Sequence, residues 1–244
     1  MLPFFNEGKR FKMQYFERLF SSIDQEKWIL LLVNDGSTDN TSDLLNQICD
    51  KYRCLILELQ QNVGKSNAVR LGMNEAMEML PRLAYVGFLD SDGAFAIEDI
   101  CSLTTLAMES NNDLIIGSRI KMAGTIICRS ALRHFVGRII ATILNQFVLE
   151  KSIYDPQSGF KLFRVSEKLR LSLSKPFKTR WFGDIELITN LWSLSSLVIK
   201  ECPVTEWKDV KGGNLKISSV FAITKELYVV FRTCNASLRG RKWT

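Results

Sequence analysis

Residues 83–93 read "LAYVGFLDSDG" and place two carboxylates, Asp90 and Asp92, directly after an apolar run. Residues two apart in a β-strand point to the same face, so these two like charges repel one another if the strand continues through them. Two interpretations follow. Either both side chains are solvated in a turn, or a cation lies between them. The choice depends on what stands at the ends of the neighbouring strands.

Apolar runs of this kind alternate with helical patterns along the chain. The strand-like runs are residues 28–36, 54–62, 83–93 and 112–119, and the helical patterns between them are about residues 39–52, 65–80 and 96–110. This alternation predicts an α/β fold, in which helices flank a mostly parallel sheet. A length of 244 residues with 46% hydrophobic content suits a single domain with one large core.

Polar residues follow the other strand-like runs as well. Asp35 follows the first run, Lys65 comes shortly after the second, and Arg119 ends the fourth. Because ligands bind at the carboxyl ends of parallel strands, we expect these side chains to share one site with Asp90 and Asp92. Mg²⁺ typically takes one or two carboxylates together with substrate phosphates. The sequence therefore favours a divalent cation that carries a diphosphate.

Several other site types are excluded by spacing. The "GKS" of residues 64–66 lacks the P-loop glycine, because Leu59 stands in its place, and the chain has no GxGxxG dinucleotide motif. Six cysteines without a CxxC pair and a single histidine offer no zinc site. We expect the cysteines to be reduced and mostly buried, as in a cytosolic protein.

The bulk charge indicates anionic partners. A formal charge of +6 and a pI near 9.0 favour phosphates, nucleic acid or a membrane surface. No targeting segment is visible at the start of the chain. The longest apolar stretches, residues 135–149 and 217–231, contain charges and are shorter than the ~20 residues of a spanning helix. We therefore expect the chain not to cross a bilayer.

Taken in order, the motifs resemble those of family 2 glycosyltransferases with the GT-A fold, and most of all the dolichyl- and polyprenyl-phosphate sugar synthases. The motifs are PxxNE at residues 3–7, "VNDGSTDNT", "NVGKSNAV", "LDSDG", "IGSR", "DPQSGFKLF" and "FGDIELI". The resemblance implies an inverting transfer from a nucleotide-diphosphate sugar, with Mg²⁺ or Mn²⁺ as cofactor and no nucleic acid as partner. It assigns the metal to Asp90 and Asp92, and the nucleotide sugar to Pro3, Asn6, Glu7, Asp35, Lys65, Asp90 and Arg119.

Two features depart from the family pattern. Relatives carry several apolar residues before PxxNE, whereas this chain starts at Met1, so we expect a first strand that is truncated or absent. Such a loss leaves sheet edges unpaired. Relatives often carry a polar residue just beyond DxD, where this chain has Ala94 and Phe95, so a water is expected to complete the metal shell.

The basic segment around residues 121–138 bears on the acceptor. Arg129 and Arg133 are spaced four apart, which would place both on one helix face, with Lys121, His134 and Arg138 nearby. A solvated basic face is the alternative. Because the planar fork of arginine suits phosphate oxygens, we expect a lipid-phosphate headgroup to dock at Arg129 and Arg133.

Two downstream aspartates are the remaining candidates for chemistry. Asp155 precedes a proline and also suits a turn, and Asp184 also suits a helix N-terminus. By resemblance both lie near the acceptor. A hydroxyl acceptor needs one of them as a general base, whereas a phosphate acceptor is already ionised at neutral pH.

The sequence divides into a catalytic domain, residues 1–216, and a C-terminal helix with a basic tail, residues 217–244. The helix either covers the core or contacts a membrane surface. Our interpretation is hexose transfer from UDP-glucose or GDP-mannose to polyprenyl or dolichyl phosphate. The enzyme is expected to be peripheral on the cytoplasmic face of a membrane, the endoplasmic reticulum in a eukaryote, with a possible membrane-anchoring partner subunit. The alternatives are transfer to a glycan or glycolipid hydroxyl, and a non-catalytic sugar-nucleotide-binding subunit.

Overall fold

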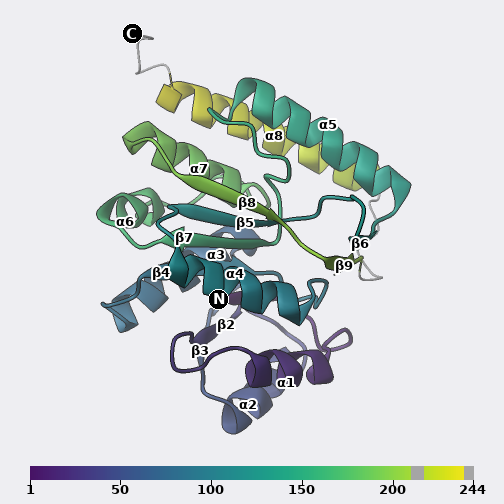
Figure 1. Cartoon of the computed structure of the whole chain (residues 1–244), viewed down its shortest axis with the longest axis vertical. Coiled ribbons are helices and arrows are strands. Elements are labelled where there is room, and N and C mark those ends of the chain that lie inside the picture. The colour runs from purple at the N-terminus through teal and green to yellow at the C-terminus, as the bar shows by residue number, and fades with distance from the viewer. Residues whose placement is uncertain (210–216, 239–244) are drawn as a thin grey trace.

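The computed structural model describes residues 1–209 and 217–238 (Figure 1). Its strands are β1 Leu2–Phe4, β2 Leu30–Asn34, β3 Cys54–Glu58, β4 Tyr85–Leu89, β5 Leu114–Ser118, β6 Ile126–Cys128, β7 Phe160–Arg164, β8 Ile199–Pro203 and β9 Glu206–Lys208. Its helices are α1 Met13–Ser22, α2 Thr41–Lys51, α3 Lys65–Met79, α4 Ile97–Glu109, α5 Ala131–Phe147, α6 Glu167–Leu173, α7 Gly183–Leu194 and α8 Ile217–Leu238.

The strands form two main sheets that lie edge to edge. One has the order β1-β2-β3 and the other the order β4-β7-β5-β8, while β6 and β9 pair separately. Met1 joins the two main sheets, because its ammonium donates to the carbonyl of Gly87 at 2.7 Å and its carbonyl accepts from Leu89 N at 3.0 Å. Strand β1 therefore lies between β2 and β4.

The expected α/β architecture is confirmed. The strands β2 to β5 and the helices α2 to α4 fall within the expected ranges, and four of the six strand pairings are parallel. Strand β7 is the exception, because it runs antiparallel to both β4 and β5. Buried apolar side chains form two clusters that share the strands between them, since alternate residues such as Leu32 and Val33 point to opposite faces.

The first strand is short but present. It has three residues and pairs in parallel with β2 from Leu2↔Leu32 to Phe4↔Asn34. The buried side chains of Leu2 and Phe4 hold it in place. The strand ends two residues before Asn6, and its carboxyl end lies at the same edge as those of β2 and β4.

The expectation of uniformly reduced cysteines is wrong for one pair. Cys49 near the end of α2 and Cys54 at the start of β3 form a disulfide, with their Cα atoms 5.3 Å apart. The tight turn from helix to strand brings them within the range that a disulfide requires. Cys101, Cys128 and Cys202 are free, and Cys128 is exposed rather than buried.

The C-terminal helix α8 packs against the protein. Val230 is buried, and Ile223, Leu227 and Phe231 pack against the core. Helices α5 and α8 lie side by side (Figure 1), with the rings of Phe147 and Phe231 5.8 Å apart. This part of α8 therefore covers the core, whereas the expected basic tail, residues 239–244, lies outside the described residues. No helix within the described ranges is long and apolar enough to cross a membrane.

Candidate active site

The polar strand ends meet at one edge of the fold, around Lys65. The ammonium of Lys65, in the first turn of α3, lies 2.5 Å from Asp90 Oδ1 at the end of β4. Burial lowers the pKa of Lys65, but the charges of Asp90, Asp184 and Asp92 outweigh it, so that the pKa is raised. Lys65 is therefore a permanent cation among three carboxylates.

The residues expected to bind a metal are Asp90 and Asp92. Asp90 Oδ1 is buried, and among the described residues its polar contact is the ion pair with Lys65. Asp92 Oδ1 accepts from Ala94 N at 3.1 Å. Burial and then the charge of Asp90 raise the pKa of Asp92.

This pair fits a divalent cation, which would neutralise the repulsion between the two carboxylates. Across residues 1–209 and 217–238 no group of three or more His, Cys, Asp or Glu side chains could hold a metal ion. Asp90 and Asp92 would therefore supply the protein ligands, and oxygens of substrate and water the rest of the shell.

Gly159, in the segment before β7, allows Asp90 its position. The amide of Asp90 donates to the carbonyl of Gly159 at 2.8 Å. A Cβ atom at residue 159 would overlap with the carboxylate of Asp90. The glycine of the "DPQSGF" motif is thus required for the close approach of this loop to the carboxylate.

Asp35 holds the loop that positions Lys65. Its buried carboxylate accepts from Val63 N at 2.8 Å, Gly64 N at 3.0 Å and Asn62 Nδ2 at 2.9 Å. Burial raises the pKa of Asp35 despite these hydrogen bonds. Gly64 has φ +85°, a conformation that favours glycine, and it directly precedes α3.

The PxxNE residues lie beside the β2–α2 loop and the DxD segment. Asn6 Oδ1 accepts from Thr38 N at 2.8 Å, and the carbonyl of Pro3 accepts from Ser91 Oγ at 2.6 Å. Burial raises the pKa of Glu7, and the nearby charge of Asp92 acts in the same direction. The structure therefore brings Pro3, Asn6 and Glu7 together with the segment of the DxD carboxylates.

Arg119 and Asp155 form a two-point ion pair. Arg119 Nε lies 2.6 Å from Oδ2 and Nη2 lies 2.7 Å from Oδ1, and the amide of Arg119 also donates to Oδ2. Burial alone would raise the pKa of Asp155, but the charge and hydrogen bonds of Arg119 lower it to about 2. Asp155 is therefore an ionised carboxylate committed to Arg119.

Asp184 is held by a residue that the sequence analysis missed. Lys161 on β7 has 0% exposure, and its ammonium donates to Asp184 Oδ2 and to the carbonyl of Ser158, both at 2.6 Å. Lysine is rarely buried unless it is paired. The signal in the sequence was a lysine within the apolar strand "FKLFR", where a solvated residue is not expected.

The two arginines expected on one helix face have different environments. Arg129 precedes the N-cap residue Ser130 and lies outside α5, so the expectation of a shared helix face is wrong. Arg133, in the first turn of α5, forms an ion pair with Asp209. Arg129 has no ion-pair partner among the described residues, and its guanidinium lies against Gly137.

Arg129 belongs to a cationic cluster with Arg119, His134 and Arg138, which together with Asp155 line a cavity of about 20 Å³. Burial and then the charge of Arg119 lower the pKa of Arg129 to about 10. The guanidinium of Arg138 lies 4.0 Å from the ring centre of Tyr154 and donates to its carbonyl. A volume of about 20 Å³ is enough for one water molecule.

A second cavity, of about 160 Å³, opens between the DxD side and α7. Its lining includes Lys65, Gln157, Ser158, Trp181 and Asp184. Trp181 is 61% exposed at the mouth. The cavity thus connects the ammonium of Lys65 with the Lys161–Asp184 pair.

The comparisons with known proteins agree with this geometry. The family model described as "Glycosyl transferase family 2" matches residues 1–169. This chain belongs to glycosyl transferase family 2. The family 2 chain is 30% identical to dolichyl-phosphate beta-glucosyltransferase ALG5C of Trichomonas vaginalis over 245 residues, which cover 93% of the chain and 68% of that relative. It is 29% identical to dolichyl-phosphate beta-glucosyltransferase of Saccharomyces cerevisiae, and the match covers 94% of this chain and 72% of that relative.

A solved structure has the same fold as this glycosyltransferase. Glucosyl-3-phosphoglycerate synthase from Mycobacterium tuberculosis, in complex with Mn²⁺, UDP and glucosyl-3-phosphoglycerate, superposes with a TM-score of 0.70. The sequences are 16% identical, and the match covers 96% of this chain and 78% of that one. The likeness shows the GT-A fold of this chain.

Proposed function

We propose that this glycosyltransferase moves glucose from UDP-glucose to dolichyl phosphate, or to a closely related polyprenyl phosphate, with inversion at the anomeric carbon. The names of the relatives support the sugar and the acceptor. One structural observation favours a phosphate acceptor over a hydroxyl acceptor. Asp155 and Asp184, the two carboxylates available as general bases, are each held by a buried cation, Arg119 and Lys161.

An ion-paired carboxylate with a pKa of about 2 is a poor proton acceptor at neutral pH. A hydroxyl nucleophile would need such an acceptor, whereas a phosphate monoester, with a second pKa near 6, attacks without one. In the proposed reaction a phosphate oxygen forms a bond to C1 of glucose from the face opposite the donor. The bond from C1 to the nucleotide oxygen breaks, and its electron pair leaves with UDP.

In this proposal each group of site residues has a separate role. Lys65 would neutralise charge on the departing diphosphate, and Asp90 and Asp92 would hold Mg²⁺ or Mn²⁺, which supplies further positive charge there. Pro3, Asn6, Glu7 and the loop anchored by Asp35 would form the nucleoside side of the site. Arg129 would meet the acceptor phosphate, because Arg119 is paired with Asp155 and Arg138 donates to the carbonyl of Tyr154, whereas Arg129 has no ion-pair partner among the described residues.

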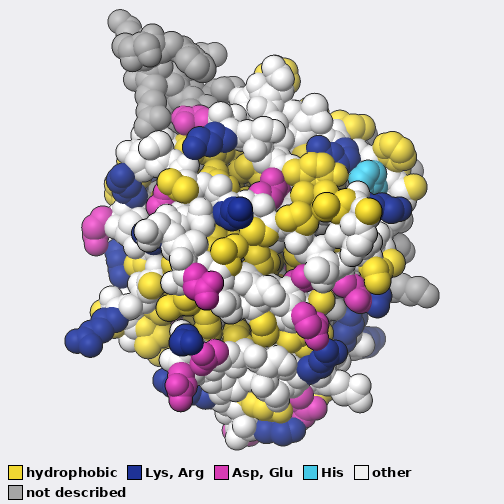
Figure 2. All heavy atoms as spheres, in the orientation of Figure 1, with side chains coloured by type: hydrophobic (Ala, Val, Ile, Leu, Met, Phe, Trp, Pro, Cys, Tyr) yellow, Lys and Arg dark blue, Asp and Glu magenta, His cyan; other side chains and the backbone are white. Residues whose placement is uncertain are grey.

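The surface beside Arg129 suits a lipid acceptor. Leu132, Phe135 and Ile139 on α5 are 65%, 66% and 59% exposed. Figure 2 shows hydrophobic side chains gathered around the histidine over α5. An exposed apolar stripe next to unpaired positive charge would suit contact with isoprenoid chains and with a membrane surface on the cytoplasmic side.

The test uses the purified chain with Mn²⁺ and UDP-glucose, and compares dolichyl phosphate with dolichol as acceptor. We expect glucosylated lipid from the phosphate alone, β-linked by NMR, and a rate that is flat with pH above the second pKa of the acceptor. Transfer to dolichol or to a glycan, with a rate that follows the ionisation of a carboxylate, would support the hydroxyl-acceptor alternative. Stabilisation by UDP-glucose without any transfer would support the non-catalytic subunit.

A further inference from the structure

A loop of residues 177–182, between α6 and α7, lies against the first turn of α3, which carries Lys65. The carbonyl of Arg180 in this loop accepts from Ser66 N at 3.0 Å. Trp181, also in the loop, lines the cavity of about 160 Å³ together with Lys65. The loop therefore borders the candidate site, although it contains none of the site residues expected from the sequence.

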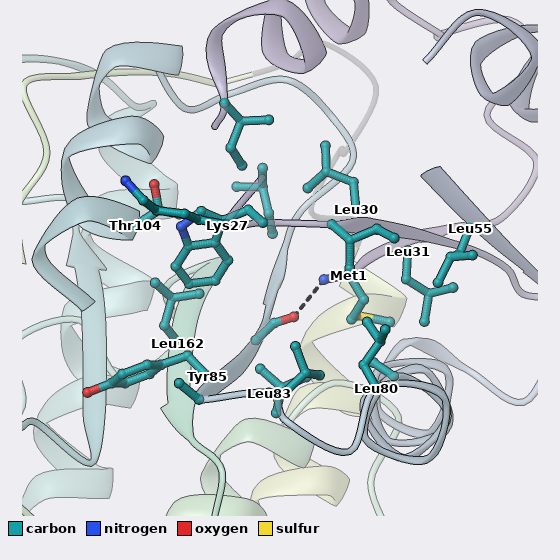
Figure 3. Close-up of a pocket in the computed structure, with 18 of the residues that line it drawn as sticks. Met1, Lys27, Leu30, Leu31, Leu55, Leu80, Leu83, Tyr85, Thr104 and Leu162 are labelled. Atoms are coloured by element: carbon teal, nitrogen blue, oxygen red, sulfur yellow. Dashed lines mark hydrogen bonds between the residues drawn. The ribbon is translucent and has the colours of Figure 1, made fainter. Parts of the chain in front are cut away.

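Helix α3 is held to the sheets by a close contact near its middle. A Cβ atom at Gly72 would overlap with the side chains of Met1 and Val33. Met1 is itself bound to β4, because its nitrogen donates to Gly87 O at 2.7 Å (Figure 3). The first turn of α3 lies about two turns before this contact, where its neighbours are the loop and the segment that Asp35 holds.

Glu226 on α8 anchors the loop through two consecutive amides. Its Oε1 accepts from Arg180 N at 3.1 Å, and its Oε2 accepts from Trp181 N at 3.0 Å. Hydrogen bonds to a carboxylate are roughly twice as strong as those between neutral groups. The backbone of Arg180 is thus bound at both its N–H, by Glu226, and its carbonyl, by Ser66 N. A single residue therefore connects the C-terminal helix with the first turn of α3.

The side chain of Arg180 makes a second connection, to the segment that precedes α3. A Cβ atom at Gly64 would lie only 3.2 Å from Arg180 Nε, and Nη2 donates to Asn62 Oδ1 at 2.5 Å. Asp35 also binds this segment, through Gly64 N and Asn62 Nδ2. The segment that leads into Lys65 therefore has two anchors, Asp35 after β2 and Arg180 in the loop.

We propose that Glu226 is a positioning residue of the candidate site, which holds Lys65 in place through Arg180. Without Glu226, the amides of Arg180 and Trp181 lose their acceptor, and the loop is free to move away from Ser66. Under the proposed function Lys65 neutralises charge on the departing diphosphate, so its displacement would slow the chemical step more than it weakens acceptor binding. This kinetic consequence rests on the proposed function, whereas the structural connection does not.

The test compares Glu226→Gln with Glu109→Gln, which makes the same change of charge at an exposed position on α4. In Glu226→Gln one acceptor oxygen becomes an NH₂ group that faces a backbone N–H. We expect hydrogen exchange at the amide of Ser66 to become about tenfold faster. Exchange at the amide of Arg119, which donates to Asp155, should not change. Glu109→Gln should alter neither amide.

The kinetic arm uses UDP-glucose, Mn²⁺ and dolichyl phosphate. We expect Glu226→Gln to lower kcat about ten- to a hundredfold, while the KM for dolichyl phosphate stays within about twofold. Arg180→Met removes the guanidinium, keeps an apolar side chain over Gly64 and should lower kcat in the same way. Because both residues act on one segment, the double variant should lose less than the product of the two single effects. Arg180→Met leaves α8 unaltered, so it carries this test if Glu226→Gln does not fold.

Unchanged exchange at Ser66 in Glu226→Gln would overturn the proposal, because the loop would then stay in place without its anchor. Equally faster exchange at Ser66 and Arg119 would also overturn it, since Glu226 would then only stabilise the whole fold. Fully multiplicative effects of Glu226→Gln and Arg180→Met on kcat would exclude the route through Arg180. If the unaltered chain transfers no glucose, the proposed function fails, but exchange at Ser66 and Arg119 still decides the role of Glu226.

Discussion

The ammonium of Lys65 lies 2.5 Å from Asp90 Oδ1, a buried oxygen with no other polar partner in the described part of the chain. Lys65 thus pairs with Asp90, whereas burial and then the charge of Asp90 raise the pKa of Asp92. A divalent cation held by both aspartates would leave Lys65 free to turn towards a diphosphate. Under the proposed function, the ion pair would be the resting arrangement of a site whose partners change when substrate binds.

The first prediction tests the role of Asp92. Asp92→Asn removes one charge from a part-buried strand end, so the fold should persist while the affinity for Mn²⁺ falls. We expect turnover to be abolished, and the stabilisation that Mn²⁺ and UDP together give in a thermal shift assay to be lost. Asp43→Asn, the same change at an exposed residue in the first turn of α2, is the control. Full activity of Asp92→Asn, or of the unaltered chain in excess chelator, would contradict the metal role.

The second prediction concerns pH and the Arg119–Asp155 pair. The pKa of Asp155 is lowered from 3.8 to about 2, so the pair contributes stability that is present above pH ~4 and is lost as the pH falls towards 2. A shift of this size corresponds to about 2 kcal/mol. In urea titrations Asp155→Asn should lower the free energy of unfolding by at least that amount at pH 7. The difference from the unaltered chain should shrink at pH 3, and a difference that is independent of pH would contradict the assignment.

The third prediction concerns the buried lysine. Lys161→Met leaves the carboxylate of Asp184, 11% exposed, without its cation, and should cost about 3 kcal/mol of unfolding free energy. The double variant Lys161→Met/Asp184→Asn removes both charges and should recover a large part of the loss. Denaturant titrations of the two single variants and the double variant give the coupling energy. Additive losses would show that the pair does not stabilise the fold.

Part of this architecture was accessible from the sequence, because periodicity reports local structure. The apolar runs and helical patterns predicted β2 to β5 and α2 to α4, and the polar strand ends predicted that Asp35, Asp90 and Arg119 would share an edge. The direction of β7 was not accessible, because the run "FKLFR" pairs equally well either way and its neighbours are distant in sequence.

The pairing of charges was the least predictable feature. Asp155 lies 36 residues from Arg119 and Asp184 lies 23 residues from Lys161, and no local rule connects residues so far apart. The spacing of Arg129 and Arg133 suggested one helix, but Ser130 caps α5 by accepting from Arg133 N, so the helix begins after Arg129. A single capping serine therefore separates the two arginines into different environments.

The fourth prediction follows from that separation and tests the acceptor. Arg129 lies in the cationic cluster beside Arg119, whereas Arg133 is already paired with Asp209. A charge-assisted hydrogen bond to phosphate is worth about 1.5–3 kcal/mol, so Arg129→Ala should raise the apparent KM for dolichyl phosphate about ten- to a hundredfold. The KM for UDP-glucose should hardly change.

Arg133→Ala is the matched control, because it removes the same charge four residues away. Its effect on the acceptor KM should be several-fold smaller, although the loss of the Asp209 pair will lower stability slightly. Arg129→Lys keeps the charge but not the planar fork, so it should restore only part of the affinity. Equal acceptor kinetics for Arg129→Ala and the unaltered chain would remove Arg129 from the acceptor site. A larger effect of Arg133→Ala would instead mean that Arg133 leaves Asp209 to bind the acceptor phosphate.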